Sequence, residues 1–247
     1  MDALAPLRAN VAAEADRPLL TYYDDATGER TELSAGELGR WAARTVGLLR
    51  SGCGLGAGDR AAVLLPPHWQ TAAVLLGAWS VGVTVSFRPT ATAGLPVLEP
   101  GADEPLDVTF IAHDRLDNWL EDVPEAHHQF VLGLPPTFGI PAGYRDYLAE
   151  VRRYPADLPT YALVRPTDPA SVDGTTYRQW GSLAHAIAER LDLRPGDRVL
   201  VDAAEYEHPL KWLLAPLAAG ASVVLCANLD RGAVASRTAA EQVTRIL

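Results

Sequence analysis

A short cassette occurs twice in this chain, and it constrains the fold more than any other sequence feature. Residues 55–63 (LGAGDRAAV) lead to 82–87 (GVTVSF), and residues 193–201 (LRPGDRVLV) lead to 220–225 (GASVVL). The copies match at one constant offset with no gap, at Gly58, Asp59, Arg60, Val63, Leu75, Leu76, Gly82 and Val85 in the first and Gly196, Asp197, Arg198, Val201, Leu213, Leu214, Gly220 and Val223 in the second. Such a repeat indicates an α/β protein built by internal duplication.

Each cassette opens a strand–helix–strand unit, in which an apolar run bounded by turn residues predicts a buried parallel strand. The predicted elements are 60–65, 69–80 and 81–87 in the first copy, and 198–202, 207–219 and 222–227 in the second. Because parallel βαβ crossovers are right-handed, we expect two similar lobes of mainly parallel sheet flanked by helices. The first lobe spans 1–158 and ends in a proline-rich connection, and the second, shortened lobe spans 159–247.

The remaining elements follow from shorter patterns. Ser34 and Glu37 form a capping box that starts a helix. We also predict strands at 19–23, 30–33, 107–112, 129–132 and 161–165, and helices at 116–120, 144–153 and 179–191.

Composition and charge exclude several classes of function. The net charge is −10, from 31 acidic and 21 basic residues, so we expect neither nucleic acid nor an anionic membrane as a partner. Two cysteines are too few for a disulfide framework or a thiolate metal site.

Lys211 is the sole lysine among many arginines, as in proteins from GC-rich bacteria. Without a signal peptide or a long apolar run, the chain is predicted to be cytoplasmic.

Several motifs resemble catalytic sites but have a simpler structural interpretation. The glycine-rich stretch 52–58 follows a helix and precedes a strand, which is the reverse of a phosphate-binding loop, so it indicates a helix C-cap and a turn. The Asp-Arg pair of each cassette is interpreted as structural, with the aspartate in a turn and the arginine along the surface. His208 differs because it follows the strand that carries Asp202, at the carboxyl end where open α/β sheets bind ligands. The alternative interpretation is a partly buried histidine at the start of a helix.

The order of motifs resembles the start of the acyl- and aminoacyl-adenylate-forming enzymes, the AMP-binding, acyl-CoA synthetase-like superfamily. The resemblance rests on 30–38 (RTELSAGEL), 58–60 (GDR), 77–82 (GAWSVG), 193–199 (LRPGDRV) and 214–224 (LAPLAAGASVV), in family order over nearly the whole chain. It implies that both lobes pack as one AMP-binding-like N-terminal domain. It also implies a family that uses ATP and a lysine-bearing phosphate loop.

The phosphate loop is where this chain departs from the family. At its place the sequence reads TDPASVDGTTYR, residues 167–178, without the flanking glycines and the lysine, and with two added aspartates. The candidate ligand-pocket residues are Asp173, Gly174, Thr175, Thr176, Arg178 and His208. The family's later motifs and its C-terminal catalytic lysine are absent from the sequence. We therefore predict no catalytic residue, no metal ligand and no cofactor, and leave open whether ATP or AMP still binds.

Three functions remain open from the sequence. The first is a catalytically degenerate relative, a pseudoenzyme that binds a ligand or a partner. The second is an adenylate-forming enzyme subunit that another adenylate-family chain completes. The third is a dimeric scaffold, because a shortened second lobe is expected to leave a sheet edge or an apolar face uncovered. We accordingly predict a homodimer.

Overall fold

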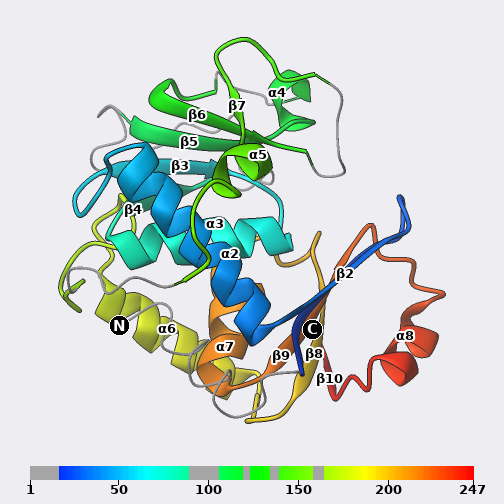
Figure 1. Cartoon of the computed structure of the whole chain (residues 1–247). Coiled ribbons are helices and arrows are strands. Elements are labelled where there is room, and N and C mark those ends of the chain that lie inside the picture. The colour runs from blue at the N-terminus through cyan, green and yellow to red at the C-terminus, as the bar shows by residue number, and fades with distance from the viewer. Residues whose placement is uncertain (1–16, 89–105, 119–122, 134–138, 158–163) are drawn as a thin grey trace. The chain divides into compact units, whose positions relative to one another are not determined.

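The computed structural model describes residues 17–88, 106–118, 123–133, 139–157 and 164–247 (Figure 1). They form two compact units, neither of which is one continuous segment. Among the described residues, the first unit holds 40–66 and those from 73 to 178, and the second holds 17–39, 67–72 and 179–247. The lobe boundary expected at 158/159 stays a prediction, because residues 158–163 and the strand expected at 161–165 lie largely outside the described residues.

The first unit contains a fully parallel five-stranded sheet in the order β4-β3-β5-β6-β7. Its strands are β3 (Arg60–Leu64), β4 (Thr84–Phe87), β5 (Leu106–Ala112), β6 (Ala126–Leu132) and β7 (Arg145–Asp146). Its short helices are α4 (Arg115–Asn118) and α5 (Tyr147–Val151). Ala62, Leu64 and Ile111 are fully buried in this sheet, as expected for parallel strands covered on both faces.

The second unit contains a five-stranded sheet in the order β10-β8-β9-β1-β2. Its strands are β1 (Pro18–Asp24), β2 (Glu29–Ser34), β8 (Arg198–Asp202), β9 (Ser222–Ala227) and β10 (Arg245–Ile246). Only β1 and β2 pair antiparallel; the other pairs are parallel. The helical elements after residue 176 are α6 (Tyr177–Arg190), η3 (Leu210–Leu214), α7 (Ala215–Ala219) and α8 (Val234–Ala240).

Helices α2 (Ala35–Gly47) and α3 (Trp69–Val81) follow the sequence patterns closely. The capping box forms, since the backbone N–H of Ser34 donates to Glu37 at 2.8 Å and the backbone N–H of Glu37 donates to the Ser34 hydroxyl at 3.3 Å. Helix α2 ends in a π-helical turn, η1 (Leu48–Gly52). Helix α3 is buried over almost its whole length, which matches its nearly uniform apolar sequence. No helix in the described part of the chain combines the length and apolar character needed to span a bilayer.

The two cassettes have the same strand register, which confirms the duplication. Arg60 lies opposite Thr84 in the β3–β4 pair, and Arg198 lies opposite Ser222 in the β8–β9 pair. The residue numbers of these two strand pairs therefore differ by the same offset as the two cassettes in the sequence.

The Gly-Asp steps of both cassettes form the same turn. The carboxylate of Asp59 accepts a hydrogen bond from the backbone of Gly56 at 2.6 Å, and that of Asp197 accepts one from the backbone of Arg194 at 2.8 Å. Gly58 has φ +96°, a left-handed conformation that favours glycine. This confirms that the aspartates are turn residues.

Some predicted ends differ from the structure. The helix expected at 207–219 begins at Leu210 with one π-helical turn, and the helix expected at 144–153 is confined to α5. Pro209 precedes the former and Asp146 caps the latter, with its carboxylate accepting from the Ala149 N–H at 2.9 Å. The Asp146 cap therefore sets the start of α5.

Candidate functional site

The altered phosphate-loop stretch forms a tight hairpin in the first unit. The backbone N–H groups of Ala170 and Ser171 both donate to the Thr175 carbonyl, at 2.8 and 3.3 Å. The Gly174 N–H donates to the Ser171 carbonyl at 3.0 Å, and Gly174 has φ +85°. The Asp173-Gly174 pair is thus a turn dipeptide whose glycine takes the left-handed conformation.

This hairpin is attached to strand β4 and to helix α3. The Val85 N–H donates to the Ala170 carbonyl at 3.0 Å, and the Val172 N–H donates back to the Val85 carbonyl at 3.3 Å. The Trp79 indole donates to the Ala170 carbonyl at 3.1 Å, and the Tyr177 hydroxyl donates to the Trp79 carbonyl at 2.9 Å. Burial raises the pKa of Tyr177, so this hydroxyl stays a donor. The loop is held as an extension of the sheet.

The Asp173 carboxylate is hydrogen-bonded within the turn of the hairpin. Its Oδ1 atom accepts from the Ser171 hydroxyl at 2.6 Å and from the Thr175 N–H at 2.9 Å. Although partial burial raises the pKa of Asp173, these hydrogen bonds lower it below its ordinary value. The carboxylate is therefore charged at neutral pH. Both donors are therefore bonded to a side chain of the loop itself.

Backbone N–H groups of the residues that flank the hairpin are also hydrogen-bonded within the same segment. The Tyr177 N–H donates to the Asp168 carbonyl at 3.1 Å, and the Arg178 N–H donates to the Pro166 carbonyl at 2.9 Å. The Asp168 carboxylate accepts from the Arg165 N–H at 2.8 Å. Arg178 is exposed, one residue into α6. Of the six predicted pocket residues, Asp173, Gly174, Thr175 and Thr176 lie in this loop, and Arg178 lies in the first turn of α6.

His208, the sixth predicted residue, belongs to the second unit. Its ring stacks on Trp180, with centroids 5.5 Å apart and planes 14° from parallel. Its Nδ1 accepts from the Leu210 N–H at 3.3 Å, so it caps the start of η3. In the described residues no three His, Cys, Asp or Glu side chains are grouped to hold a metal ion.

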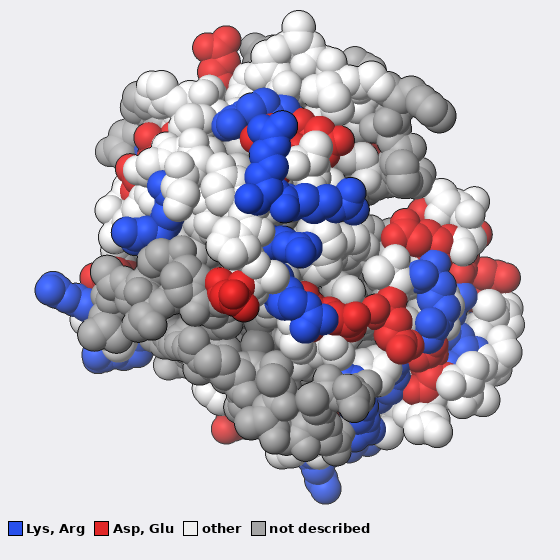
Figure 2. Space-filling model, in the orientation of Figure 1, with Lys and Arg blue, Asp and Glu red and all other residues white. Residues whose placement is uncertain are grey.

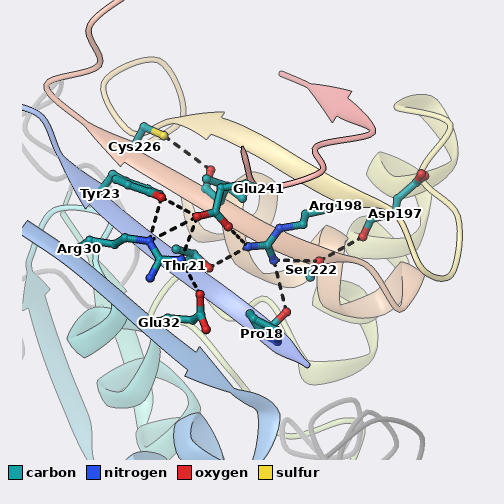
Figure 3. A network of polar contacts seen from close by, with 11 residues as sticks. Pro18, Thr21, Tyr23, Arg30, Glu32, Asp197, Arg198, Ser222, Cys226 and Glu241 are labelled. Carbon is teal, nitrogen blue, oxygen red and sulfur yellow. Dashed lines mark hydrogen bonds and ion pairs between the residues drawn. The ribbon is translucent and has the colours of Figure 1, made fainter. Parts of the chain in front are cut away.

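The second unit contains a buried polar network that the sequence did not reveal (Figure 3). Glu241 lies at its centre and accepts hydrogen bonds from the Tyr23 hydroxyl at 2.5 Å, from Arg30 Nη2 at 2.9 Å and from Arg198 Nη2. Arg198 also donates to the Thr21 hydroxyl at 2.9 Å. The network joins the C-terminal segment of the described chain to β1, β2 and β8.

Arg198 corrects one expectation, since its side chain does not lie along the surface. Only 7% of the Arg198 side chain and 8% of the Glu241 side chain are exposed. Burial raises the pKa of Glu241, but hydrogen bonds from Tyr23, Arg198 and Arg30 outweigh it and lower that pKa to about 2. The pair is therefore a buried ion pair with further hydrogen bonds, the arrangement that such charges need.

A cavity of about 230 Å³ lies at the amino ends of β1, β8 and β9. Its apolar walls include Leu19 and Ala35, and Pro18 and Ser222 line it as well. Open α/β sheets bind their ligands at the carboxyl ends of the strands, so the cavity lies at the edge of this sheet opposite the carboxyl ends. It contains none of the predicted pocket residues.

Comparisons with known proteins show which sequences and folds this chain is similar to. No protein-family model matches the chain. It is 40% identical over 240 residues to the TIGR03089 family protein of Mycobacterium tuberculosis, an alignment that covers 93% of this chain and 91% of that protein. Its fold is similar to acetoacetyl-CoA synthetase from Streptomyces lividans (TM-score 0.76, 22% identity, 99% of this chain and 42% of that chain). It is also similar to the N-terminal domain of FACL13 from Mycobacterium tuberculosis (TM-score 0.72, 18% identity, 98% of this chain and 61% of that chain).

These likenesses confirm the expected fold, two mostly parallel sheets with flanking helices as in the N-terminal region of acyl-CoA synthetases. The chain spans 42% to 61% of the length of these two solved chains. The identity to the mycobacterial protein over nearly all of both sequences shows a closer relationship. The chain belongs to the TIGR03089 family.

Proposed function

We propose that this chain is a catalytically degenerate, acyl-CoA synthetase-like protein that binds a ligand or a partner and forms no adenylate. The observation that carries the proposal is the Asp173 carboxylate, which accepts the Ser171 hydroxyl and Thr175 N–H hydrogen bonds. Adenylation passes through a highly charged phosphoryl centre that requires cations and free donors. In this loop the donors are taken, and the group that takes them is an anion.

The sole lysine supports the same proposal. Lys211 lies in η3 of the second unit, with Nζ 4.9 Å from the centroid of the Tyr206 ring. A cation–π contact to a neighbouring ring is a sufficient role for an exposed ammonium. The hairpin segment has no lysine of its own.

The purified chain is therefore expected to catalyse no ATP–pyrophosphate exchange above the enzyme-free background, with any carboxylate of an aliphatic, aromatic and amino-acid panel. A solved relative such as acetoacetyl-CoA synthetase serves as the positive control. Calorimetry with ATP, AMP and a non-hydrolysable acyl-adenylate mimic identifies whether any adenylate is still bound. Exchange by the chain alone would refute the proposal, and exchange only after adding an adenylate-family partner would support the two-chain enzyme instead.

The homodimer stays a prediction, which sedimentation velocity tests.

Two substitutions at Asp173 separate the effect of charge from that of occupancy. Asp173→Gly removes the side chain and frees both donors, so pyrophosphate affinity is expected to rise about tenfold, or about 1.4 kcal/mol. Asp173→Asn removes the charge but leaves an oxygen in the same position, so a smaller gain is expected. Isothermal titration with pyrophosphate measures both, with Asp168→Asn as the charge-matched control. Equal gains in all three variants would show that overall charge, not the filled turn, governs anion binding.

A further inference from the structure

An arginine surface lies on the first unit, over α2 and α5, where Figure 2 shows basic side chains gathered. Its members are two arginines of α2 and three in or beside β7 and α5: Arg40, Arg44, Arg145, Arg152 and Arg153. Arg40 and Arg44 are one helical turn apart and therefore neighbours on the helix. Arg40, Arg152 and Arg153 are exposed. Such a surface is unusual on a chain whose net charge is −10.

Two tyrosines hold the two arginine-bearing segments against each other. The hydroxyls of Thr45 and the fully buried Tyr147 are 2.7 Å apart. Tyr154 packs against α2 and η1 at two glycines. A Cβ added to Gly47 would lie 2.7 Å from the Tyr154 Cβ, and one added to Gly52 would lie 2.1 Å from the Tyr154 hydroxyl. Arg152 and Arg153 are thus held beside α2 by close packing.

Trp41 contacts two arginines of the arginine surface. The guanidinium carbons of Arg44 and Arg152 lie 5.1 and 5.9 Å from the centroid of its ring, within reach of cation–π attraction. The Nε atom of Arg44 is buried and has no hydrogen-bond partner in the described structure. Tryptophan and arginine are the residues most enriched at the energetic centres of protein interfaces.

The arginine surface keeps an excess of positive charge. Glu150 pairs with Arg153 at 2.8 Å and approaches Arg145 at 3.9 Å. The Asp146 carboxylate accepts the Ala149 N–H at the start of α5. Among the described ion pairs, Glu150 compensates part of the charge of two of the five arginines, so the group keeps a net positive charge.

We propose that this arginine surface docks an acidic segment of a partner protein. Guanidinium groups match carboxylates through paired hydrogen bonds, and the Debye length of about 8 Å lets the surface act locally despite the negative charge elsewhere. Nucleic acid and anionic bilayers have dense, extended charge that the rest of the chain repels. A protein segment can present a few carboxylates and an apolar side chain to five arginines and one tryptophan.

The proposal names the class of partner for the binding role proposed above, and it rests on that proposed function. The probe is a short fluorescein-labelled peptide of glutamate and leucine, titrated with the full chain at low salt. A variant with three exposed reversals, Arg40→Glu, Arg152→Glu and Arg153→Glu, is expected to bind it at least about tenfold more weakly. The indole N–H resonance of Trp41, assigned with Trp41→Phe, is expected to shift on peptide binding to the unmodified chain.

The matched control reverses three exposed arginines elsewhere, Arg165→Glu, Arg190→Glu and Arg231→Glu, which changes the net charge equally. It is expected to bind the peptide within about twofold of the unmodified chain. Circular dichroism confirms that both variants fold. Equal losses in the two variants, or tighter binding of a DNA duplex or of phosphatidylserine vesicles than of the peptide, would overturn the inference. Failure of the proposed function would be seen separately, as ATP–pyrophosphate exchange.

Discussion

The Glu241→Ala variant is expected to lose about 3 to 5 kcal/mol of unfolding free energy, as measured by urea denaturation followed by circular dichroism. Glu241 is the carboxylate at which Arg30, Arg198 and the Tyr23 hydroxyl converge. Its removal leaves the Arg198 guanidinium buried without its counter-ion, and an uncompensated buried charge is among the costliest defects in a folded protein.

The control for this prediction is Glu32→Gln. Glu32 also pairs with Arg30, at 2.5 Å, but 40% of the Glu32 side chain and 46% of the Arg30 side chain are exposed. Exposed ion pairs contribute about 1 kcal/mol or less, so this variant is expected to remain close to the unmodified chain. Similar losses in Glu241→Ala and Glu32→Gln would show that the network adds no stability through burial.

The same network predicts a dependence of stability on pH. The pKa of Glu241 is lowered from an ordinary value of 4.5 to about 2. A carboxyl group whose pKa is lower in the folded state stabilises the protein above its unfolded pKa, and this contribution is lost as the pH falls through the folded pKa. The stability difference between the unmodified chain and Glu241→Ala should therefore be constant above about pH 5 and shrink toward pH 2. A difference that does not change between pH 7 and pH 3 would contradict the assignment.

The fold was predictable where short-range patterns set it. The Gly-Asp turns, the capping box and the parallel strands of both cassettes follow from local spacing, and the structure has all of them. The pairing of β1 with β9 was not predictable in this way. It joins segments separated by some two hundred residues, and neither strand contains a pattern that specifies its partner.

The candidate site was likewise predictable only where short-range sequence patterns set it. The added negative charge at Asp173 was evident from the sequence, and the Asp-Gly dipeptide is a turn signal that could also have predicted the filled hairpin. The burial of Arg198 could not have been predicted, because its partner Glu241 lies 43 residues away and follows a short helix without a distinctive motif. The two Asp-Arg steps look alike in sequence, but they meet later carboxylates differently. The Arg60 backbone N–H donates to Asp107 at 2.8 Å, whereas the Arg198 side chain donates to Glu241.

The last prediction concerns Gly77, where α2 and α3 approach each other in the first unit. A Cβ added there would lie 2.6 Å from both Cβ and Cγ2 of Thr45 and 3.2 Å from the Ala42 carbonyl oxygen. Gly77→Ala is therefore expected to lower the unfolding free energy by about 1 to 3 kcal/mol through overpacking. Gly39→Ala is the matched control, because that position in α2 has no neighbouring atom within 4 Å. It should instead stabilise the helix by about 0.5 to 1 kcal/mol.

A double-mutant cycle with Thr45→Ser tests whether Thr45 is the cause of the cost. Serine keeps the hydroxyl that lies 2.7 Å from Tyr147 Oη but removes Cγ2, one of the two side-chain atoms that the new methyl group would meet. Gly77→Ala should therefore cost less in the Thr45→Ser background, with a coupling energy of about 0.5 kcal/mol or more. Strict additivity of the two substitutions would mean that the Thr45 Cγ2 atom does not cause the cost.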